Sequence, residues 1–230
     1  MLLGRLNANS NSTVYWMLRN IHATPGLLED VRREIAPACV LRDDRLQMDW
    51  RRLLHDSPLF KSCYFESLRL DSAPWSFKRL QKDCMVREAA EDARLGGFSG
   101  MTTTTETQPP TPFALQKGEA VLIPADLHHN DARYFPDPTE FAPQRFFVHS
   151  SDGAVKSEIK SIRPYGGGAT MCKGRLFAER EVLAFVAAML TCWDLTPAGG
   201  SSWEMNGRGK TSGVCRPKEN LRVRMTRRFI

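Results

Sequence analysis

The 230-residue sequence predicts a mainly helical fold with small β-sheets. Apolar residues recur at helical spacing over residues 9–22 and 27–35. A Ser-Pro helix start precedes residues 58–70, and residues 173–193 form a long apolar stretch that suits a core helix. Shorter apolar runs of a length suited to strands occupy residues 76–88, 113–124 and 214–225. The hydrophobic content of 42% and the charged content of 25% are those of an ordinary globular chain, and no internal repeat is present.

The first half of the chain is expected to be mostly helical. The helix over 9–22 is interrupted by Pro25-Gly26, and a second helix follows over 27–35. Residues 36–48 are expected to form a polar connection, and Asp49 to Leu54 a short helix.

A longer helix is expected to begin at Ser57-Pro58. Ser57 suits the N-cap and Pro58 the first helical position, where a missing N–H costs nothing. This helix should run to Leu70, and Pro74 marks its end.

The second half is expected to combine short strands, loops and one long helix. The loop at 89–112 is rich in Gly, Thr and Pro, and residues 125–162 are expected to be mostly irregular because of their prolines. The long helix is followed by a glycine-rich turn at 197–213 and a closing strand.

Charge and cysteine usage exclude several classes of protein. The net charge is +6 with a pI near 9.1, but aromatic residues do not alternate with the basic ones, so nucleic acid is not expected as a partner. A solvated basic surface or a docking face for an acidic partner is expected instead. The six cysteines form no C-x-x-C pair and suggest no disulfide framework, which fits a reducing compartment. The longest uncharged apolar stretch, Val182 to Trp193, is shorter than the roughly 20 residues that span a bilayer.

The most informative segment is a glycine loop with one cysteine, Arg163 to Arg175. Its glycines allow a close approach of the backbone to a flat ligand, and the dipole of the following helix favours the Cys172 thiolate over the thiol. One thiolate without further ligands nearby suits haem iron better than zinc, which takes four ligands.

Two other glycine-loop chemistries fail at the position that matters. A phosphate-binding P-loop needs Gly before the lysine, but Cys172 precedes Lys173. The dinucleotide pattern G-x-G-x-x-G, started at Gly166, ends on Met171. A glycine turn leading into a core helix beside a buried cysteine stays open as an alternative.

A charge cluster is expected behind this loop. Glu66 and Arg69 share one face of an apolar helix, and buried charges need further partners. Arg145 can supply a third charge, so that one glutamate between two arginines would hold the irregular segment to the helix.

With these motifs in place, the chain resembles the C-terminal half of a cytochrome P450, a haem-thiolate monooxygenase. The resemblance rests on the helix that begins the chain and on three motifs in the family's order. These are E-x-x-R at Glu66 and Arg69, Pro143-Gln144-Arg145-Phe146, and F-x-x-G-x-x-x-C-x-G with Tyr165 in place of Phe, followed by Gly168, Cys172 and Gly174. It implies haem as the cofactor, Cys172 as the ligand of its iron, and Tyr165, Gly168 and Gly174 around it. Residues 1–230 are then expected to form a single partial domain of a longer enzyme.

The opening helix departs from the usual family pattern. The usual threonine and acidic positions fall on Asn9 and Ala8, so Asn7 to Ser10 resembles the branch of sterol hydroxylases, prostacyclin synthase and fungal relatives. Asn9 and Ser10 are the candidate catalytic residues, because an amide can donate a hydrogen bond to bound oxygen or to a peroxide. The alternative is that both residues merely cap the helix.

The basic residues that would bind the haem propionates also need reassignment. The position two before the cysteine, which is often basic in the family, is Thr170. The resemblance places such contacts at Lys78 or Arg79, with help from Arg163; ordinary surface charge is the alternative.

The resemblance implies partners as well. An electron donor of the NADPH-cytochrome reductase type and a small apolar organic substrate are expected. A full-length relative would sit on the cytosolic face of the endoplasmic reticulum membrane, whereas this chain has no anchor of its own. Because the family's chains are longer, a non-catalytic truncated remnant stays open, as does a haem-thiolate isomerase or dehydratase.

Overall fold

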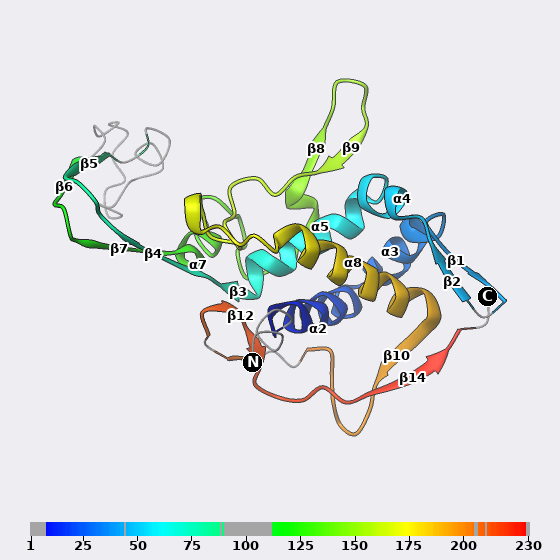
Figure 1. Cartoon of the computed structure of the whole chain (residues 1–230). Helices are drawn as coiled ribbons and strands as arrows, with labels where there is room; N and C mark the ends of the chain where they lie inside the picture. The colour runs from blue at the N-terminus through cyan, green and yellow to red at the C-terminus, as the bar shows by residue number, and fades with distance from the viewer. Residues whose placement is uncertain are drawn as a thin grey trace. The chain divides into compact units, whose positions relative to one another are not determined.

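The computed structural model describes residues 8–43, 45–87, 89, 112–204, 207–209 and 211–228 (Figure 1). The chain divides into a helical unit, Met1–Trp75 with Pro124–Ile230, and a strand unit, Ser76–Ile123. The described residues form helices and two-stranded sheets, which confirms the predicted mainly helical class with small β-sheets.

The helices lie in the helical unit. Their bounds are α2 (Ala8–Ala23), α3 (Leu27–Ile35), α4 (Trp50–His55), α5 (Pro58–Leu70), α7 (Ala125–His129) and α8 (Arg175–Cys192), with 3₁₀ turns η1 (Pro143–Phe146) and η2 (Gly168–Thr170). Thus the helices expected from the sequence are present, each within about two residues of its expected ends.

The strands pair two by two. In the helical unit these are β1 (Cys39–Arg42) with β2 (Arg45–Met48), β3 (Ser72–Ala73) with β12 (Gly213–Val214), β8 (Phe147–His149) with β9 (Val155–Ser157), β10 (Trp193–Pro197) with β14 (Val223–Arg227), and β11 (Arg208–Gly209) with β13 (Arg216–Pro217). The strand unit is built from β4 (Trp75–Arg79) with β7 (Ala120–Pro124) and β5 (Cys84–Arg87) with β6 (Pro112–Leu115). The predicted loop at 89–112 lies almost wholly outside the described residues.

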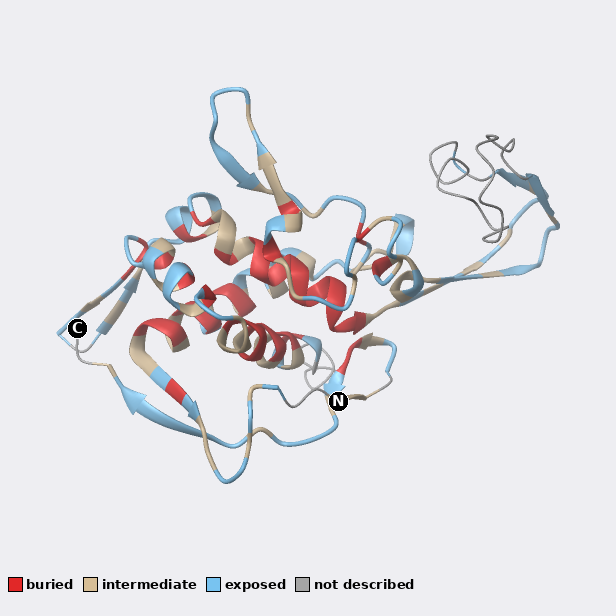
Figure 2. Ribbon diagram, turned by 180° about the vertical axis from the view of Figure 1, so that it is seen from behind, coloured by how far each residue is buried: buried red, intermediate tan, exposed pale blue. Residues whose placement is uncertain are grey.

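Helix α5 forms the centre of the helical unit. It is buried along almost its whole length, and buried residues are red in Figure 2. It contacts α2, α3 and α8. Such a helix can carry Tyr64 and Phe65 on different faces because each face meets another element. The same burial encloses Glu66 and Arg69, which therefore need partners from the chain.

The expected polar connection at 36–48 is wrong, because these residues form the β1–β2 hairpin. The register pairs Arg42 with Arg45, and Asp43 adopts a positive φ of 47°. Aspartate tolerates this conformation through local hydrogen bonding. Four-residue strands carry too short an alternation to be separated from polar loop in the sequence alone.

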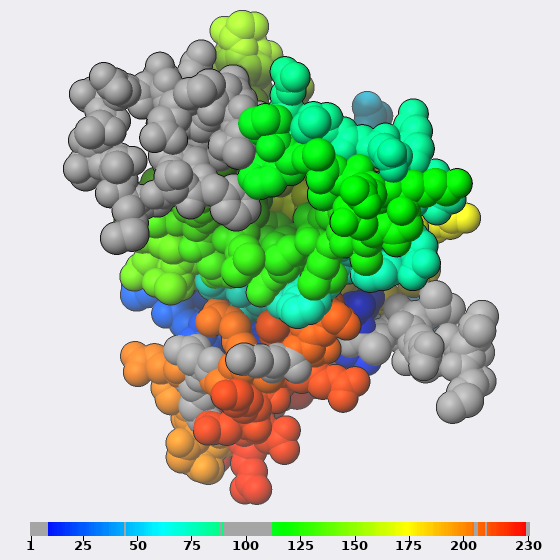
Figure 3. Space-filling model, turned by 90° about the vertical axis from the view of Figure 1, so that its left-hand side faces the viewer, coloured from blue at the N-terminus to red at the C-terminus, as the bar shows by residue number. Residues whose placement is uncertain are grey.

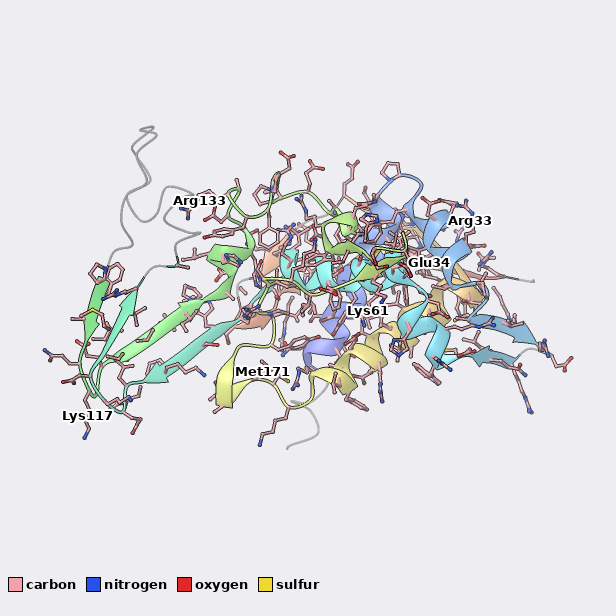
Figure 4. The ribbon with its side chains drawn as sticks, turned by 90° about the horizontal axis from the view of Figure 1, so that it is seen from above. Arg33, Glu34, Lys61, Lys117, Arg133 and Met171 are labelled. Carbon is pink, nitrogen blue, oxygen red and sulfur yellow. The ribbon has the colours of Figure 1, made fainter. Side chains whose placement is uncertain are left out.

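Ser57 is the N-cap of α5 and Pro58 begins the helix, as predicted, but the capping chemistry comes from elsewhere. The Ser57 side chain makes no capping hydrogen bond. Instead the Glu34 carboxylate of α3 accepts from the backbone N–H of Leu59 at 2.9 Å and of Phe60 at 2.7 Å (Figure 4). A carboxylate from another helix thus satisfies the first N–H groups of α5, and its negative charge suits the helix dipole.

The segment 125–162 is more ordered than predicted. It contains α7, η1 and the β8–β9 hairpin. The hairpin is held to α5 by a hydrogen bond of 2.8 Å from Ser62 Oγ to Ser157 Oγ. Contacts to α5, rather than local sequence preference, therefore order much of this segment.

Candidate functional site

The cysteine loop is closed by its own backbone hydrogen bonds. The N–H of Cys172 donates to the Tyr165 carbonyl at 3.0 Å, and that of Met171 to the Gly168 carbonyl at 3.1 Å. Gly166 and Gly168 have φ angles of 70° and 63°, which glycine adopts without strain. The turn therefore explains why glycines occupy these two positions, and Figure 4 shows Met171 on the segment that leads into α8.

The Cys172 side chain lies exposed beside the N-terminus of α8. A Cβ added to Gly174, the N-cap of α8, would lie 3.9 Å from Cys172 Sγ. The sulfur is therefore close to the N-terminal end of an 18-residue helix. Exposure excludes the alternative of a cysteine buried for packing alone.

The donor set around Cys172 fits a haem better than zinc. Within the described part of the chain, no group of three or more His, Cys, Asp or Glu side chains is placed to hold a metal ion. A Cβ at Gly167 or Gly168 would meet nothing within 4 Å, so the loop borders open space. One exposed sulfur beside open space matches a flat ring whose iron takes a single protein ligand on this side.

A pair of tyrosines joins the loop to α5. The hydroxyl groups of Tyr64 and Tyr165 are hydrogen-bonded to each other, and Tyr165 also accepts the N–H of Cys172 through its carbonyl. Burial raises the pKa of both hydroxyls above the usual value for tyrosine, so both stay neutral. Nearby, Lys61 of α5 and Glu179 of α8 form an ion pair of 3.0 Å. These contacts place the loop and α8 against α5.

The structure brings Glu66, Arg69 and Arg145 together. Glu66 and Arg69 are both 0% exposed. Glu66 accepts from Arg69 Nε at 2.7 Å and Nη2 at 2.8 Å, from Arg145 Nε at 3.3 Å and from the Ala142 N–H at 3.0 Å. One carboxylate thus has four donors, which offsets the cost of burying its charge.

Arg69 uses its remaining donors on the segment that precedes Arg145. Its Nη1 donates to the carbonyls of His129 at 2.7 Å and Pro138 at 2.8 Å, and its Nη2 to that of Glu140 at 3.2 Å. Because the guanidinium is a planar fork with several donors, one side chain can bind three backbone carbonyls that are well separated along the chain. A lysine, with one nitrogen, could not reproduce this arrangement.

His129 is a site residue that sequence reasoning missed. It is 0% exposed, and its Nε2 accepts the backbone N–H of Arg163 at 2.9 Å, where the cysteine loop begins. Burial, together with the charges of His128 and Arg69, lowers the pKa of His129 to about 4. His129 therefore links the two sites: its backbone carbonyl accepts from Arg69 in the charge cluster, and its neutral ring accepts from the cysteine loop. A single sequence does not reveal whether a histidine is buried. Only the position of His129, just before the irregular segment, could have suggested a structural role for it.

Other predicted site residues are placed less specifically. The Arg163 guanidinium donates to the carbonyls of Lys160, Ser161 and Ile162 and is otherwise exposed. Lys78 is half-buried and Arg79 exposed on β4 of the strand unit. Their roles as propionate contacts stay predictions.

Asn9 and Ser10 lie in the first turns of α2 as described. Ser10 is buried and Asn9 exposed, and the Asn9 Oδ1 accepts the N–H of Val214 at 3.3 Å. Asn9 therefore lies inside the helix and binds another segment, which differs from a capping role. A catalytic role for either residue stays a prediction. Among the helices of the described residues, none is long and apolar enough to cross a membrane.

Comparison with known proteins gives consistent results. The cytochrome P450 family model matches residues 102–225. Cytochrome P450 monooxygenase poxD of Penicillium oxalicum is 32% identical over 197 residues, which are 86% of this chain and 36% of that protein. Cytochrome P450 7A1 of Rattus norvegicus is 26% identical over 208 residues, which are 84% of this chain and 37% of that protein. These relatives fit the expected likeness to fungal members and to the sterol-hydroxylase branch.

The solved structures agree in fold. The crystal structure of a cytochrome P450, CYP102L1, superposes with a TM-score of 0.69 at 21% identity, covering 96% of this chain and 43% of that one. The chain thus spans well under half the length of the relatives that it matches. Membership of this family implies a haem bound by a cysteine thiolate, and the match covers the cysteine loop and the irregular segment that contacts the charge cluster. The chain belongs to the cytochrome P450 family.

Proposed function

We propose that this chain is the thiolate-bearing part of a haem monooxygenase and that Cys172 is the ligand of the iron. The observation that carries the proposal is the single exposed sulfur of Cys172 on a closed glycine loop, next to the N-terminus of α8. A thiolate-bound haem supplies the activation of O2 by which one oxygen atom is inserted into an organic substrate.

The residues of the chain would hold and orient the cofactor. Cys172 would provide the thiolate, while the backbone around Tyr165, Gly168 and Gly174 would border the ring. Lys78, Arg79 and Arg163 are the candidates for the cofactor's carboxylates, because cations form charge-assisted hydrogen bonds with them. The cluster of Glu66, Arg69 and Arg145 would act through the backbone, by fixing the segment that leads to the loop.

Substrate and partner follow from the same site. A small apolar organic substrate would lie near Asn9, whose NH2 group can donate a hydrogen bond to a reacting oxygen. Lys173, Arg175 and Arg180 carry positive charge around the first turns of α8, which suits an acidic reductase of the NADPH-cytochrome type. We infer that residues 1–230 act as one partial domain of a longer enzyme of the endoplasmic reticulum membrane.

The ligand assignment is tested by haem titration of the full chain. The reduced carbon monoxide complex should show the long-wavelength band of a thiolate ligand, and Cys172→Ser should abolish that band. Cys192→Ser, at the other end of α8, is the matched control and should retain it. A thiolate-type spectrum that survives in Cys172→Ser would refute the assignment. Absence of saturable haem binding in the parent chain would favour a non-catalytic remnant.

Asn9 also supports a second function, a haem-thiolate isomerase or dehydratase. Its amide replaces the usual threonine, and an amide donor suits a peroxide oxygen as well as bound O2. Turnover of an organic hydroperoxide without reductant would favour this reaction. A requirement for NADPH and a reductase would favour the monooxygenase.

A further inference from the structure

A second buried charge lies at the other end of α5, at its C-cap Asp71. This carboxylate is 0% exposed. Its Oδ1 accepts from Arg208 Nε at 2.7 Å, and its Oδ2 from Asn20 Nδ2 of α2 at 2.7 Å. Arg19 supports the same cluster through Asn20 Oδ1 at 2.8 Å. One carboxylate therefore joins α2, the end of α5 and the C-terminal segment 207–217.

The backbone around Asp71 binds the same C-terminal segment. The N–H of Cys215 donates to the Asp71 carbonyl at 2.8 Å, and the next residues form β3, which pairs Ser72 with Val214 of β12. Trp16 Nε1 of α2 donates to the Cys215 carbonyl at 2.7 Å. In the space-filling view, orange and red C-terminal residues lie next to patches of blue from the N-terminal part of the chain (Figure 3). The segment of β12 and Cys215 is thus bound by the end of α5 through Asp71 and Ser72, and by α2 through Trp16.

The far end of β12 sets the orientation of the Asn9 amide. The N–H of Val214 donates a hydrogen bond to Asn9 Oδ1 at 3.3 Å. Gly213 has a φ of 121°, and a Cβ there would lie 3.0 Å from Asn9 Oδ1, so only glycine allows this approach. With its oxygen engaged, Asn9 is left with its NH2 group, for which no described residue provides an acceptor.

We propose that Asp71 is a positioning residue for Asn9. Through its contacts with Arg208 and Asn20, Asp71 holds β12 in place beside α2. In this position β12 engages the Asn9 Oδ1, and the amide presents its NH2 group. Asn9 then acts as a donor, never as an acceptor, toward an electron-rich oxygen of the bound reactant. The role of the amide in the reaction rests on the proposed function. Its orientation does not, because every contact lies within the described residues of the helical unit.

Hydrogen exchange on the full ¹⁵N-labelled chain, which needs no haem, tests the proposal. Arg208→Ala leaves the buried carboxylate without its cation and should raise the exchange rates of the Val214 and Cys215 amides about 10- to 100-fold, the loss expected for a charge-assisted hydrogen bond. The Asn9 side-chain NH2 resonances should shift in the same variant. Arg208→Lys, which keeps the charge, should recover much of the protection. Arg33→Ala, which breaks an exposed ion pair with Asp30, is the matched control and should change neither signal.

Two outcomes would overturn the proposal. In the first, the Val214 amide and the Asn9 NH2 signals are unchanged in Arg208→Ala. In the second, the Leu183 amide in α8 loses as much protection as Val214, which would make Asp71 a contributor to general stability. Gly213→Ala provides a second route, since it should displace the Asn9 signals while leaving the Asp71 contacts in place. Failure of haem binding or of turnover would count against the proposed function alone.

Discussion

The buried ring of His129 makes the stability of the protein depend on pH in a predictable window. Its pKa is lowered from 6.5 to about 4, because the ring is buried and because His128 and Arg69 are close to it. Each pKa unit corresponds to ~1.4 kcal/mol, so the neutral ring contributes about 3 kcal/mol to the free energy of unfolding. The ring is 0% exposed, which leaves little solvent screening to reduce this value.

The sign follows from which state binds the proton. Above pH 6.5 the ring is neutral in both states, and the contribution is complete. Between pH 6.5 and about 4 the unfolded chain takes up a proton that the folded chain refuses, so stability falls as the pH falls. Protonation of Nε2 also removes the acceptor for the Arg163 N–H, so the cysteine loop should loosen first.

His129→Gln removes the titration and retains an acceptor. The Gln oxygen can take the place of Nε2 and accept the Arg163 N–H, but it carries no proton in this range. Urea denaturation at pH 7.5 and pH 4.5 should show that the parent loses about 2–3 kcal/mol more than the variant over this interval. His55→Gln, at an exposed histidine, is the control and should follow the parent. Equal pH dependence in His129→Gln and the parent would refute the reasoning.

Three further perturbations test the contacts around the loop. Arg69→Ala leaves the buried Glu66 carboxylate partly unpaired and should lower the free energy of unfolding by about 3–5 kcal/mol. Arg133→Ala, which breaks an exposed ion pair, should lower it by under about 1 kcal/mol. Urea denaturation of both variants measures the difference. Tyr165→Phe leaves the buried Tyr64 hydroxyl without its partner and should lower the free energy of unfolding by about 1–3 kcal/mol. A variant with both tyrosines changed to Phe should be less destabilised, because no hydroxyl is then left unpaired. A larger loss of stability in the double variant would contradict the pairing. Glu34→Ala removes the cap of α5 and should cost about 0.5–2 kcal/mol, measured by thermal denaturation followed by circular dichroism, and an unchanged midpoint would show that the cap is dispensable.

The features that sequence predicted well are local ones. The spacing of apolar residues locates α2 and α3, the Ser57-Pro58 start locates α5, and the long apolar run locates α8. The glycine pattern before Cys172 likewise reflects backbone angles that few other residues adopt. The family motifs then indicated that Glu66, Arg69 and Arg145 belong together, although the sequence carries no distances.

The features that sequence missed depend on contacts between distant segments. The capping hydrogen bonds of α5 come from Glu34 on another helix, while the side chain of the N-cap residue Ser57, which has the right chemistry, makes none. His129 is buried because α5 and the cysteine loop enclose it. Arg208 and Asp71 are 137 positions apart, and nothing in either neighbourhood marks them as partners.

The sequence by itself determined the family, the helices and the cysteine that is the candidate ligand, because periodicity, backbone freedom and motif spacing are properties of short segments. Only the tertiary structure decided which buried charges meet, which histidine stays neutral and how the Asn9 amide is turned. The physical reason is that desolvation acts on a group only once other segments enclose it, and the partners that then offset its cost come from wherever the fold brings them.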